Sequence, residues 1–584
     1  MGYIIMTDAA NINWLFSSYN DAQGRTYIIS FYNKWDPQKQ QSRVAKRVHV
    51  GRLNADTGEV YLGKTYLKNH PEYEGKTVFY EDNALVERSK EQVDEIKKEA
   101  SNDLSFRCDC VSFGLTYACH ELASNSNMLS ALREVFGEDG DELLRLGIYQ
   151  FCSQNQALQN YDDWLAMNYL PKAKPLSSNQ ISKLLSKVTQ EDIDKYFALR
   201  FKHILDRHNQ KNTVGDYVPP MMMAIDSTSI STYSKTIKDA AYGHAKQDDF
   251  LKQVNLTLCV DYDTGDICYA YQSEGSINDM SLFPDLLMRM QNNNFDLSNV
   301  LLTTDRGYSS VMNIQKQINC KLKFLTGVRL SEDSVKKSID RYKASLTAPS
   351  FLSGKLGVYA RTAPIERWTS TTDGINIDYD VYLHLYRDGA LAESQNAAFM
   401  TNVQALLESK NKGLKGDSNL WRNYSKFLFQ DEKTKKWNIN YKAVEMACKY
   451  NGYFAIRTNE ILDPFDSLII YRERNIVECA FRQFKVLNGC DRLQATNLTY
   501  IGKLFIHLIA QSLRMMMTVK ACSHKADGKV LPGDSLNKAM MQLQKLQASK
   551  PAGRGVWIVK ELPKNTRELF ELFDIQTPKK QVKN

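Results

Sequence analysis

Two aspartates stand where the sequence pattern predicts the ends of buried strands. Asp226 follows the apolar run 221–225, and Asp305 follows the run 300–304. An uncompensated charge is costly at such a position, so a carboxylate there indicates a partner or a bound cation. If the two strands are neighbours, the two carboxylates converge on one site.

A third acid is placed by helical periodicity. At about 100° per residue, Tyr471, Arg474, Glu478 and Lys485 project onto one narrow face, whereas Glu473 projects away from it. A lone acid between basic residues is typical of a metal ligand beside phosphate-binding cations. The alternative is a surface ion-pair stripe, which i, i+4 spacing often produces. Apolar residues along the same segment favour a helix packed on a core, and so the first interpretation.

These residue types suit phosphoryl transfer at DNA, in which two divalent cations bridge the attacking and leaving oxygens. Carboxylate oxygens are the ligands that Mg²⁺ prefers. Asp226, Asp305 and Glu478 are therefore the candidate cation ligands of the sequence.

Composition describes an ordinary globular protein of several domains: 584 residues, 43% hydrophobic and 24% charged. The net charge of +8 permits a polyanionic partner without requiring one. The eleven cysteines are scattered singly, which favours reduced thiols over a disulfide framework. We find no signal peptide pattern, and the apolar segment 504–517 is too short to span a bilayer. We therefore expect a soluble, cytoplasmic, nucleoid-associated protein without a membrane partner.

The order of predicted strands and helices around the aspartates indicates a mixed α/β layer. Apolar runs predict five strands, at 221–227, 254–261, 267–273, 300–304 and 322–326, and helical periodicity predicts helices at 280–290 and 309–318.

Shifts in pattern divide the chain into six regions. A β-rich N-terminal region (1–75) contains a basic stretch, Arg43 to Arg52, that suits either DNA phosphate contact or a solvated hairpin face. The other regions are a helical DNA-binding or dimerisation region (76–215), the first part of a catalytic core (216–329), a β-rich insertion (330–455), the second part of the core with the glutamate helix (456–525), and a C-terminal tail (526–584).

The segment from Tyr471 to Lys485 resembles the Tyr-x2-Arg-x3-Glu-x6-Lys signature of DDE transposases in the bacterial insertion-sequence family four, and all four signature positions match. Segment 224–228 resembles the family's first-aspartate strand, and segment 304–308 resembles its second. Segment 452–459 is similar to the strand before its glutamate helix. The resemblance covers residues 215 to 520.

This resemblance implies a ribonuclease-H-like catalytic domain with a mixed five-stranded sheet, interrupted by a β-rich insertion. It implies that Asp226, Asp305 and Glu478 bind two Mg²⁺ ions, with Mn²⁺ as a substitute. Tyr471, Arg474 and Lys485 then contact DNA phosphates at the transposon end. The implied partners are double-stranded DNA, as inverted repeats and target, and a second copy of the chain in a homodimer. Relatives proceed through a DNA hairpin.

Two other functions remain open: a ribonuclease-H-like DNA nuclease, and a catalytically silent DNA-binding repressor derived from a transposase. Trp368, Trp421 and Trp437 are candidates to hold a flipped base, although a core role is more common for such residues. A zinc site is a further possibility for the group Cys108, Cys110, Cys119 and His120. The spacing of these residues differs from that of the usual zinc knuckles, so reduced thiols are the default interpretation.

Overall fold

The protein divides into two units in a computed structural model. The structure describes residues 14–21, 25–36, 41–54, 58–89, 91–94, 108–215, 217–243, 250–372, 375–414, 418–551 and 556–583. The first unit comprises Met1–Cys110, Ala548–Lys560 and Lys580–Asn584, and the second comprises Val111–Gln547 and Glu561–Lys579. We describe each unit by itself.

The N-terminal part of the first unit is built on a four-stranded antiparallel sheet in the order β1-β2-β3-β4. Its strands are β1 (Leu15–Asn20), β2 (Thr26–Asp36), β3 (Gln41–Leu53) and β4 (Val60–Leu62). Alternation of side chains along the strands buries one face, where Ile28, Val50 and Val60 pack with Tyr66 of α1 (Lys64–Asn69). A hairpin of β5 (Thr77–Glu81) and β6 (Ala84–Arg88) follows.

A further small sheet joins three strands of the C-terminal region to β7. It has the order β22-β21-β20-β7, with strands Gln581–Lys583, Val556–Val559, Gln547–Pro551 and Cys108–Ser112.

The second unit begins with a group of helices that end before the central sheet. They are α3 (Gly114–Asn125), α4 (Met128–Phe136), α5 (Asp139–Ser153), α6 (Tyr161–Met167), α7 (Ser178–Leu185) and α8 (Gln190–Asn212). Capping boxes start the last two, with Ser177 and Gln180 at α7 and Thr189 and Asp192 at α8.

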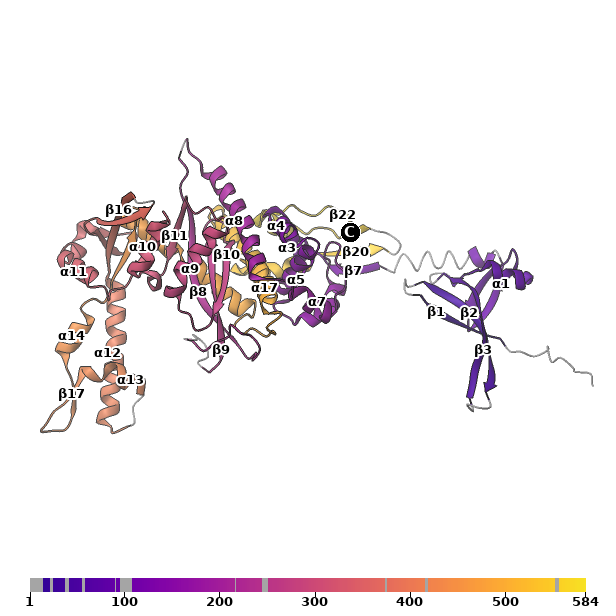
Figure 1. Ribbon diagram of the computed structural model, residues 1–584, viewed down its shortest axis with the longest axis horizontal. Helices are drawn as coiled ribbons and strands as arrows, with labels where there is room; N and C mark the ends of the chain where they lie inside the picture. Colours follow the sequence, from indigo (N-terminus) through magenta and orange to yellow (C-terminus); the bar gives the residue numbers. More distant parts are fainter. Residues whose placement is uncertain are drawn as a thin grey trace, which may run out of the picture. The chain divides into compact units, whose positions relative to one another are not determined.

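The five strands and two helices that the sequence predicts around the aspartates are present. They are β8 (Met221–Thr232), β9 (Lys252–Asp261), β10 (Ile267–Glu274), β11 (Val300–Thr304), β12 (Lys323–Val328), α9 (Asp279–Asn292) and α10 (Val311–Asn319). The strands are neighbours in the order β10-β9-β8-β11-β12 (Figure 1). Strand β8 pairs antiparallel with β9 and parallel with β11. This mixed sheet with helices fits a ribonuclease-H-like fold.

The sheet continues beyond the five predicted strands to a total of ten in the part of the chain described. Strand β12 would otherwise leave unpaired N–H and C=O groups at an edge, and β19 pairs with it antiparallel instead. The added strands are β19 (Tyr453–Thr458), β16 (Ile375–Asp388), β14 (Val358–Thr362) and β13 (Leu352–Ser353) in that order, with β15 (Glu366–Thr372) paired to β16.

Between β12 and β19 the chain contains helices as well as strands. The helices are α11 (Asp333–Tyr342), α12 (Gly389–Asn411), α13 (Ser418–Tyr424) and α14 (Tyr441–Cys448), and a small sheet joins β17 (Leu428–Gln430) to β18 (Trp437–Ile439). Buried residues of α12, Val403 and Leu406, pack with Phe427, Leu428 and Val444 in a separate small core.

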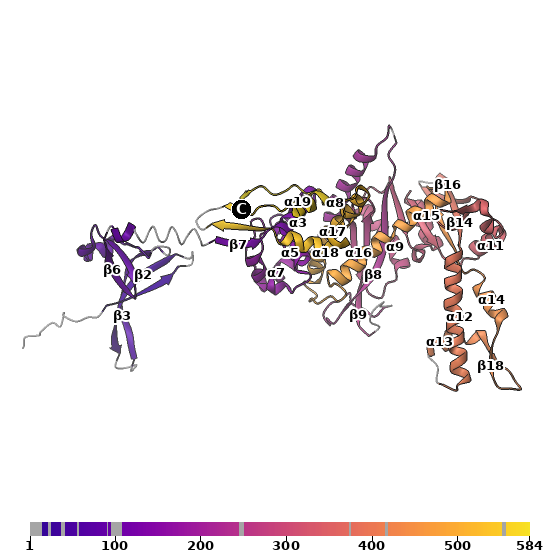
Figure 2. The ribbon, with the colours of Figure 1, turned by 180° about the vertical axis from the view of Figure 1, so that it is seen from behind.

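The chain returns to the central sheet through α15 (Pro464–Glu473) and α16 (Asn475–Arg482). Helix α16 packs against β8, although the two are about 250 residues apart in sequence (Figure 2). Helix α17 (Tyr500–Ser523) follows, then α18 (Leu536–Gln544) and α19 (Lys564–Leu572).

Helix α17 is buried along most of its length and packs on α5 and α7. At the contact with α7, a Cβ on Gly502 would overlap the carbonyl oxygen of Leu185. The two helices therefore approach each other more closely than any side chain at this position would allow. Among the described residues, no helix combines the length and apolar character needed to cross a bilayer.

We predict that Gly502→Ala lowers the free energy of unfolding by about 1–3 kcal/mol, because the added methyl group separates α17 from α7. Thermal unfolding measures the effect. The matched control is Gly389→Ala at the start of α12, where a Cβ meets no atom within 4 Å. Equal stability of both variants would contradict the close helix contact.

Candidate active site

Asp226 and Asp305 lie side by side because of the register between β8 and β11. The last pair of this parallel ladder joins Thr304 to Ile225, so Asp226 within β8 and Asp305 directly after β11 both follow that pair. Neighbouring strands lie about 4.8 Å apart, which places the two carboxyl groups at one edge of the sheet. Both residues are half-buried.

Glu478 reaches the same place from α16. The three acids line one cavity of about 340 Å³, together with Ser227, Thr228, Gly307, Tyr308 and Phe481. The structure thus brings the three sequence-predicted acids together from two strands and a helix. Glu478 is the most open of them, with a side chain 52% exposed.

Backbone N–H groups orient both aspartates. The amide of Ser227 donates to Asp226 Oδ1 at 2.8 Å, and the amide of Arg306 donates to Asp305 Oδ1 at 2.5 Å. Such bonds favour the charged carboxylate. The loop after Asp305 is held in turn by Arg329, whose guanidinium donates to the carbonyl oxygens of Arg306 at 3.1 Å and Gly307 at 3.3 Å.

Arg474 forms ion pairs with two of the acids. Its Nη2 donates to Glu478 Oε1 at 2.7 Å, and its Nη1 lies 3.6 Å from Asp226 Oδ2. Burial by itself would lower the pKa of this guanidinium. The negative charge of its neighbours has the larger combined effect, and the net pKa is raised; these neighbours are Tyr471, Asp305, Asp226 and Glu478. Arg474 therefore stays charged and offsets the repulsion among the carboxylates.

Tyr471 lies close to this ion pair, with the Arg474 guanidinium carbon 5.6 Å from the centre of its ring. Its hydroxyl occupies the space that a side chain on Gly327 of β12 would need. Burial is the main reason that the pKa of Tyr471 rises to about 12, so its hydroxyl stays protonated at neutral pH. Gly327 is a site residue that the sequence did not single out.

The helix that carries these residues is not continuous, contrary to the straight helix assumed in the projection. Helix α15 ends at Glu473, and Arg474 lies in a turn before α16. Residues Gln483–Leu487 then form a π-helix, in which each turn contains more residues than in an α-helix. Lys485 lies in this π segment, is 9% exposed and does not line the cavity of the acids.

The donor set fits a hard divalent cation, because carboxylate oxygens from three elements open into one cavity. Within the described residues, however, no three His, Cys, Asp or Glu side chains are already arranged as metal ligands. The guanidinium of Arg474 pairs with Asp226 and Glu478 instead. A cation bound by all three carboxylates would share Asp226 and Glu478 with Arg474, which contacts one oxygen of each.

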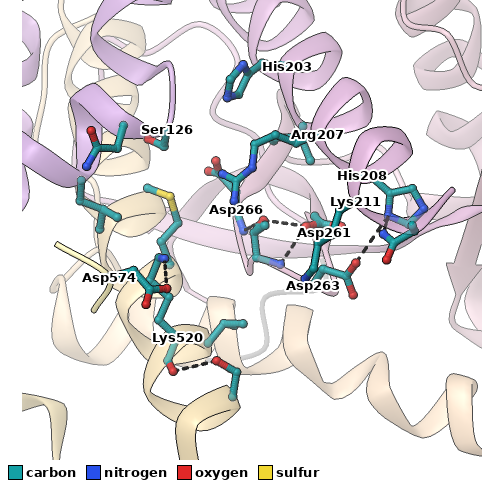
Figure 3. A pocket seen from close by; sticks show the side chains of 18 residues that line it. Ser126, His203, Arg207, His208, Lys211, Asp261, Asp263, Asp266, Lys520 and Asp574 are labelled. Atoms are coloured by element: carbon teal, nitrogen blue, oxygen red, sulfur yellow. Dashed lines mark hydrogen bonds and ion pairs between the residues drawn. The ribbon is translucent and has the colours of Figure 1, made fainter. Parts of the chain in front are cut away.

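A second and larger cavity, of about 500 Å³, lies among α3, α8, α17 and the β9–β10 turn (Figure 3). Two close pairs lie in its lining: His208 Nδ1 is 3.5 Å from Asp263, and Lys520 is 2.7 Å from Asp574. We assign the chemistry to the smaller cavity because it contains the three acids that the sequence singles out, from two neighbouring strands and a helix.

The other sequence candidates lie away from the acids. Trp421 and Trp437 pack edge to face with ring centres 5.8 Å apart, and Trp368 donates to Glu366 at 3.1 Å; none of the three lines the acid cavity. Cys119 is fully buried in α3, where burial raises the pKa of its thiol. The side chain of Cys108 lies outside the described residues.

Comparison with known proteins supports a DDE transposase. Residues 219–508, just under half of the chain, match the family described as "Transposase DDE domain", and all three acids fall within them. A solved piggyBac transposase synaptic complex with hairpin DNA is similar at a TM-score of 0.33 and 11% identity, covering 69% of this chain and 70% of that chain. That likeness is too low to support an inference. No curated protein matches the chain.

We predict that Gly327→Ala lowers the free energy of unfolding by about 1–3 kcal/mol, since the new methyl group meets the Tyr471 hydroxyl. Adding Tyr471→Phe to this variant removes the overlapping oxygen, so the double variant should regain stability. A double-mutant cycle from thermal or urea unfolding measures the coupling. Additive effects of the two changes would show that the hydroxyl does not lie over Gly327.

We predict that Arg474→Gln destabilises the protein in EDTA by about 1–3 kcal/mol, because charged carboxylates lose their buried partner. Added Mg²⁺ should then raise the melting temperature of the variant more than that of the wild type. Arg472→Gln, at an exposed position two residues away, is the control. If the variant and the wild type respond alike to EDTA and Mg²⁺, Arg474 does not compensate the acids.

Proposed function

We propose that this chain is a DNA transposase that cleaves DNA at the ends of an insertion sequence and joins those ends to target DNA. The observation that carries the proposal is the shared cavity of Asp226, Asp305 and Glu478. The match of residues 219–508 to a transposase DDE domain supports it.

The three acids are the proposed ligands of two Mg²⁺ ions, for which Mn²⁺ can substitute. When bound, such ions activate a water or a 3′-hydroxyl and stabilise the leaving oxygen. Asp226 and Asp305 each accept a hydrogen bond from a backbone amide, which orients their carboxylates. Glu478 is more exposed and comes from a helix, so it completes the site from the solvent side.

Arg474, Tyr471 and Lys485 are the proposed phosphate contacts at the cleaved end. Arg474 is the strongest of the three candidates, because it contacts Asp226 and Glu478, and a cation that took over these carboxylates would leave its guanidinium without them. Its guanidinium can then take a phosphate oxygen in their place. The protonated hydroxyl of Tyr471 is a suitable second donor. Lys485 requires movement of the π segment to reach the same phosphate.

The finer assignment rests on the Tyr-x2-Arg-x3-Glu-x6-Lys resemblance to insertion-sequence family four. We extend the proposal accordingly to inverted-repeat duplexes as substrates, a hairpin intermediate and a homodimer in the DNA complex. A nuclease of the same fold and a silent repressor are the competing functions. The intact set of three acids disfavours the repressor.

The test is incubation of the full chain with Mg²⁺ and a supercoiled plasmid that carries the inverted repeats of its own element. Excised ends and insertion products support the transposase. Linear fragments without insertion support the nuclease, and binding without cleavage supports the repressor. Either of the last two outcomes overturns the proposal.

We predict that Glu478→Gln abolishes cleavage, by at least about 100-fold, because the neutral amide is a poor cation ligand. Binding of end DNA should persist, since the amide keeps the shape of the side chain. The control is Glu473→Gln, an exposed neighbour that does not line the cavity. Gel assays of plasmid excision and of end binding measure both effects, and normal excision by the Glu478→Gln variant would falsify the ligand assignment.

A further inference from the structure

The hairpin of β2 and β3 extends beyond the rest of its sheet as a two-stranded ribbon. Pairing of β1 with β2 ends at the Leu15–Phe31 pair, and β4 pairs only with residues 51–53 of β3. Five further pairs of the hairpin, from Tyr32–Lys46 to Asp36–Gln41, therefore have no third strand beside them in the described residues (Figure 1). We call residues 32–36 and 41–46 the ribbon.

The ribbon carries positive charge on directly opposed positions. Lys34 pairs across the strands with Arg43, and Lys46 pairs with Tyr32, two residues before Lys34. Opposed residues share a face, so the three cations lie together, and all three are exposed. The described ribbon also contains one acid, Asp36, which lies on the same face two residues after Lys34, so three cations stand against one carboxylate.

Such a pattern works against the stability of the isolated ribbon. Like charges directly opposite each other destabilise a strand pair, and a solvated ribbon is usually supported by opposite charges. The ribbon also makes few contacts with a hydrophobic core, because the buried residues of this sheet, such as Ile28 and Val50, lie outside the ribbon. The arrangement therefore fits a partner that supplies negative charge.

The opposite face of the ribbon is also suited to a nucleic acid. Trp35 lies there and is 61% exposed, and Arg47, which pairs with Phe31, lies on the same face at the base. A flat acidic protein surface would meet only one face of the ribbon. A groove of duplex DNA has phosphates on both walls, and its major groove admits a two-stranded β-ribbon.

We propose that the β2–β3 ribbon is a DNA-binding element that enters a groove of duplex DNA, with Lys34, Arg43 and Lys46 contacting phosphates. This inference rests on the proposed function, because it names the element that holds the transposase on its DNA. The contacts are to the backbone, so the ribbon contributes affinity for any sequence.

The test compares Lys34→Gln/Arg43→Gln with Lys64→Gln/Lys68→Gln in the full chain. The control pair removes two exposed charges from α1 of the same unit, so both variants have the same net charge. Fluorescence anisotropy in EDTA measures binding to a labelled mixed-sequence duplex and to its single strand over a range of salt concentrations. Thermal unfolding confirms that both variants are folded.

We expect the ribbon variant to bind the duplex at least about tenfold more weakly, and the slope of log K against log salt to decrease by about 2, one for each lost phosphate contact. The control should bind like the wild type. Equal binding by the ribbon variant and the control overturns the proposal, as does a defect confined to the single strand.

The same measurements separate this inference from the proposed function. If the wild type cleaves and inserts DNA but the ribbon variant binds normally, only the ribbon assignment fails. If ribbon charges are needed for binding but no cleavage occurs with Mg²⁺, the proposed transposase fails while the ribbon assignment stands. A wild type that binds no duplex overturns both.

Discussion

The geometry of the site depends on the parallel register of β8 and β11, which puts Asp226 and Asp305 next to each other. Two carboxylates at this separation repel, and partial burial strengthens the repulsion because the local dielectric is lower than in water. The fold meets this cost with backbone amides and with Arg474, which together stabilise the charged forms. The remaining features of the site serve to hold these compensating groups in place.

The third acid, Glu478, reaches the site even though a long insert separates it from the two aspartates in sequence. About 170 residues separate Asp305 from Glu478, and they include the helices of the insert and its separate core. The chain nevertheless returns through β19, which hydrogen-bonds to β12 in the same sheet as both aspartates. Strand β19 also pairs with β16 and is followed by α15 and α16, so the glutamate helix is connected directly to the sheet that carries both aspartates.

The strands and the acids were predictable because each is marked by local pattern. Apolar runs before Asp226 and Asp305 identify buried strands, and apolar residues around Glu478 identify a helix packed on a core. The single helical face expected for Tyr471 to Lys485 is interrupted by the turn at Arg474. The sequence did not reveal the turn at Arg474 or the π segment, because both depend on packing against β8 and α17. It also missed Gly327 and Arg329, whose roles come from contacts with Tyr471 and with the loop after Asp305. Those pairs are distant in sequence and carry no common motif.

The internal pairing of Arg474 has a consequence for how the chain folds. Many small metal-binding domains cannot fold until the ion arrives, since nothing else neutralises their ligands. Here a side chain of the chain itself performs that neutralisation. The chain can therefore reach its native shape before any cation binds.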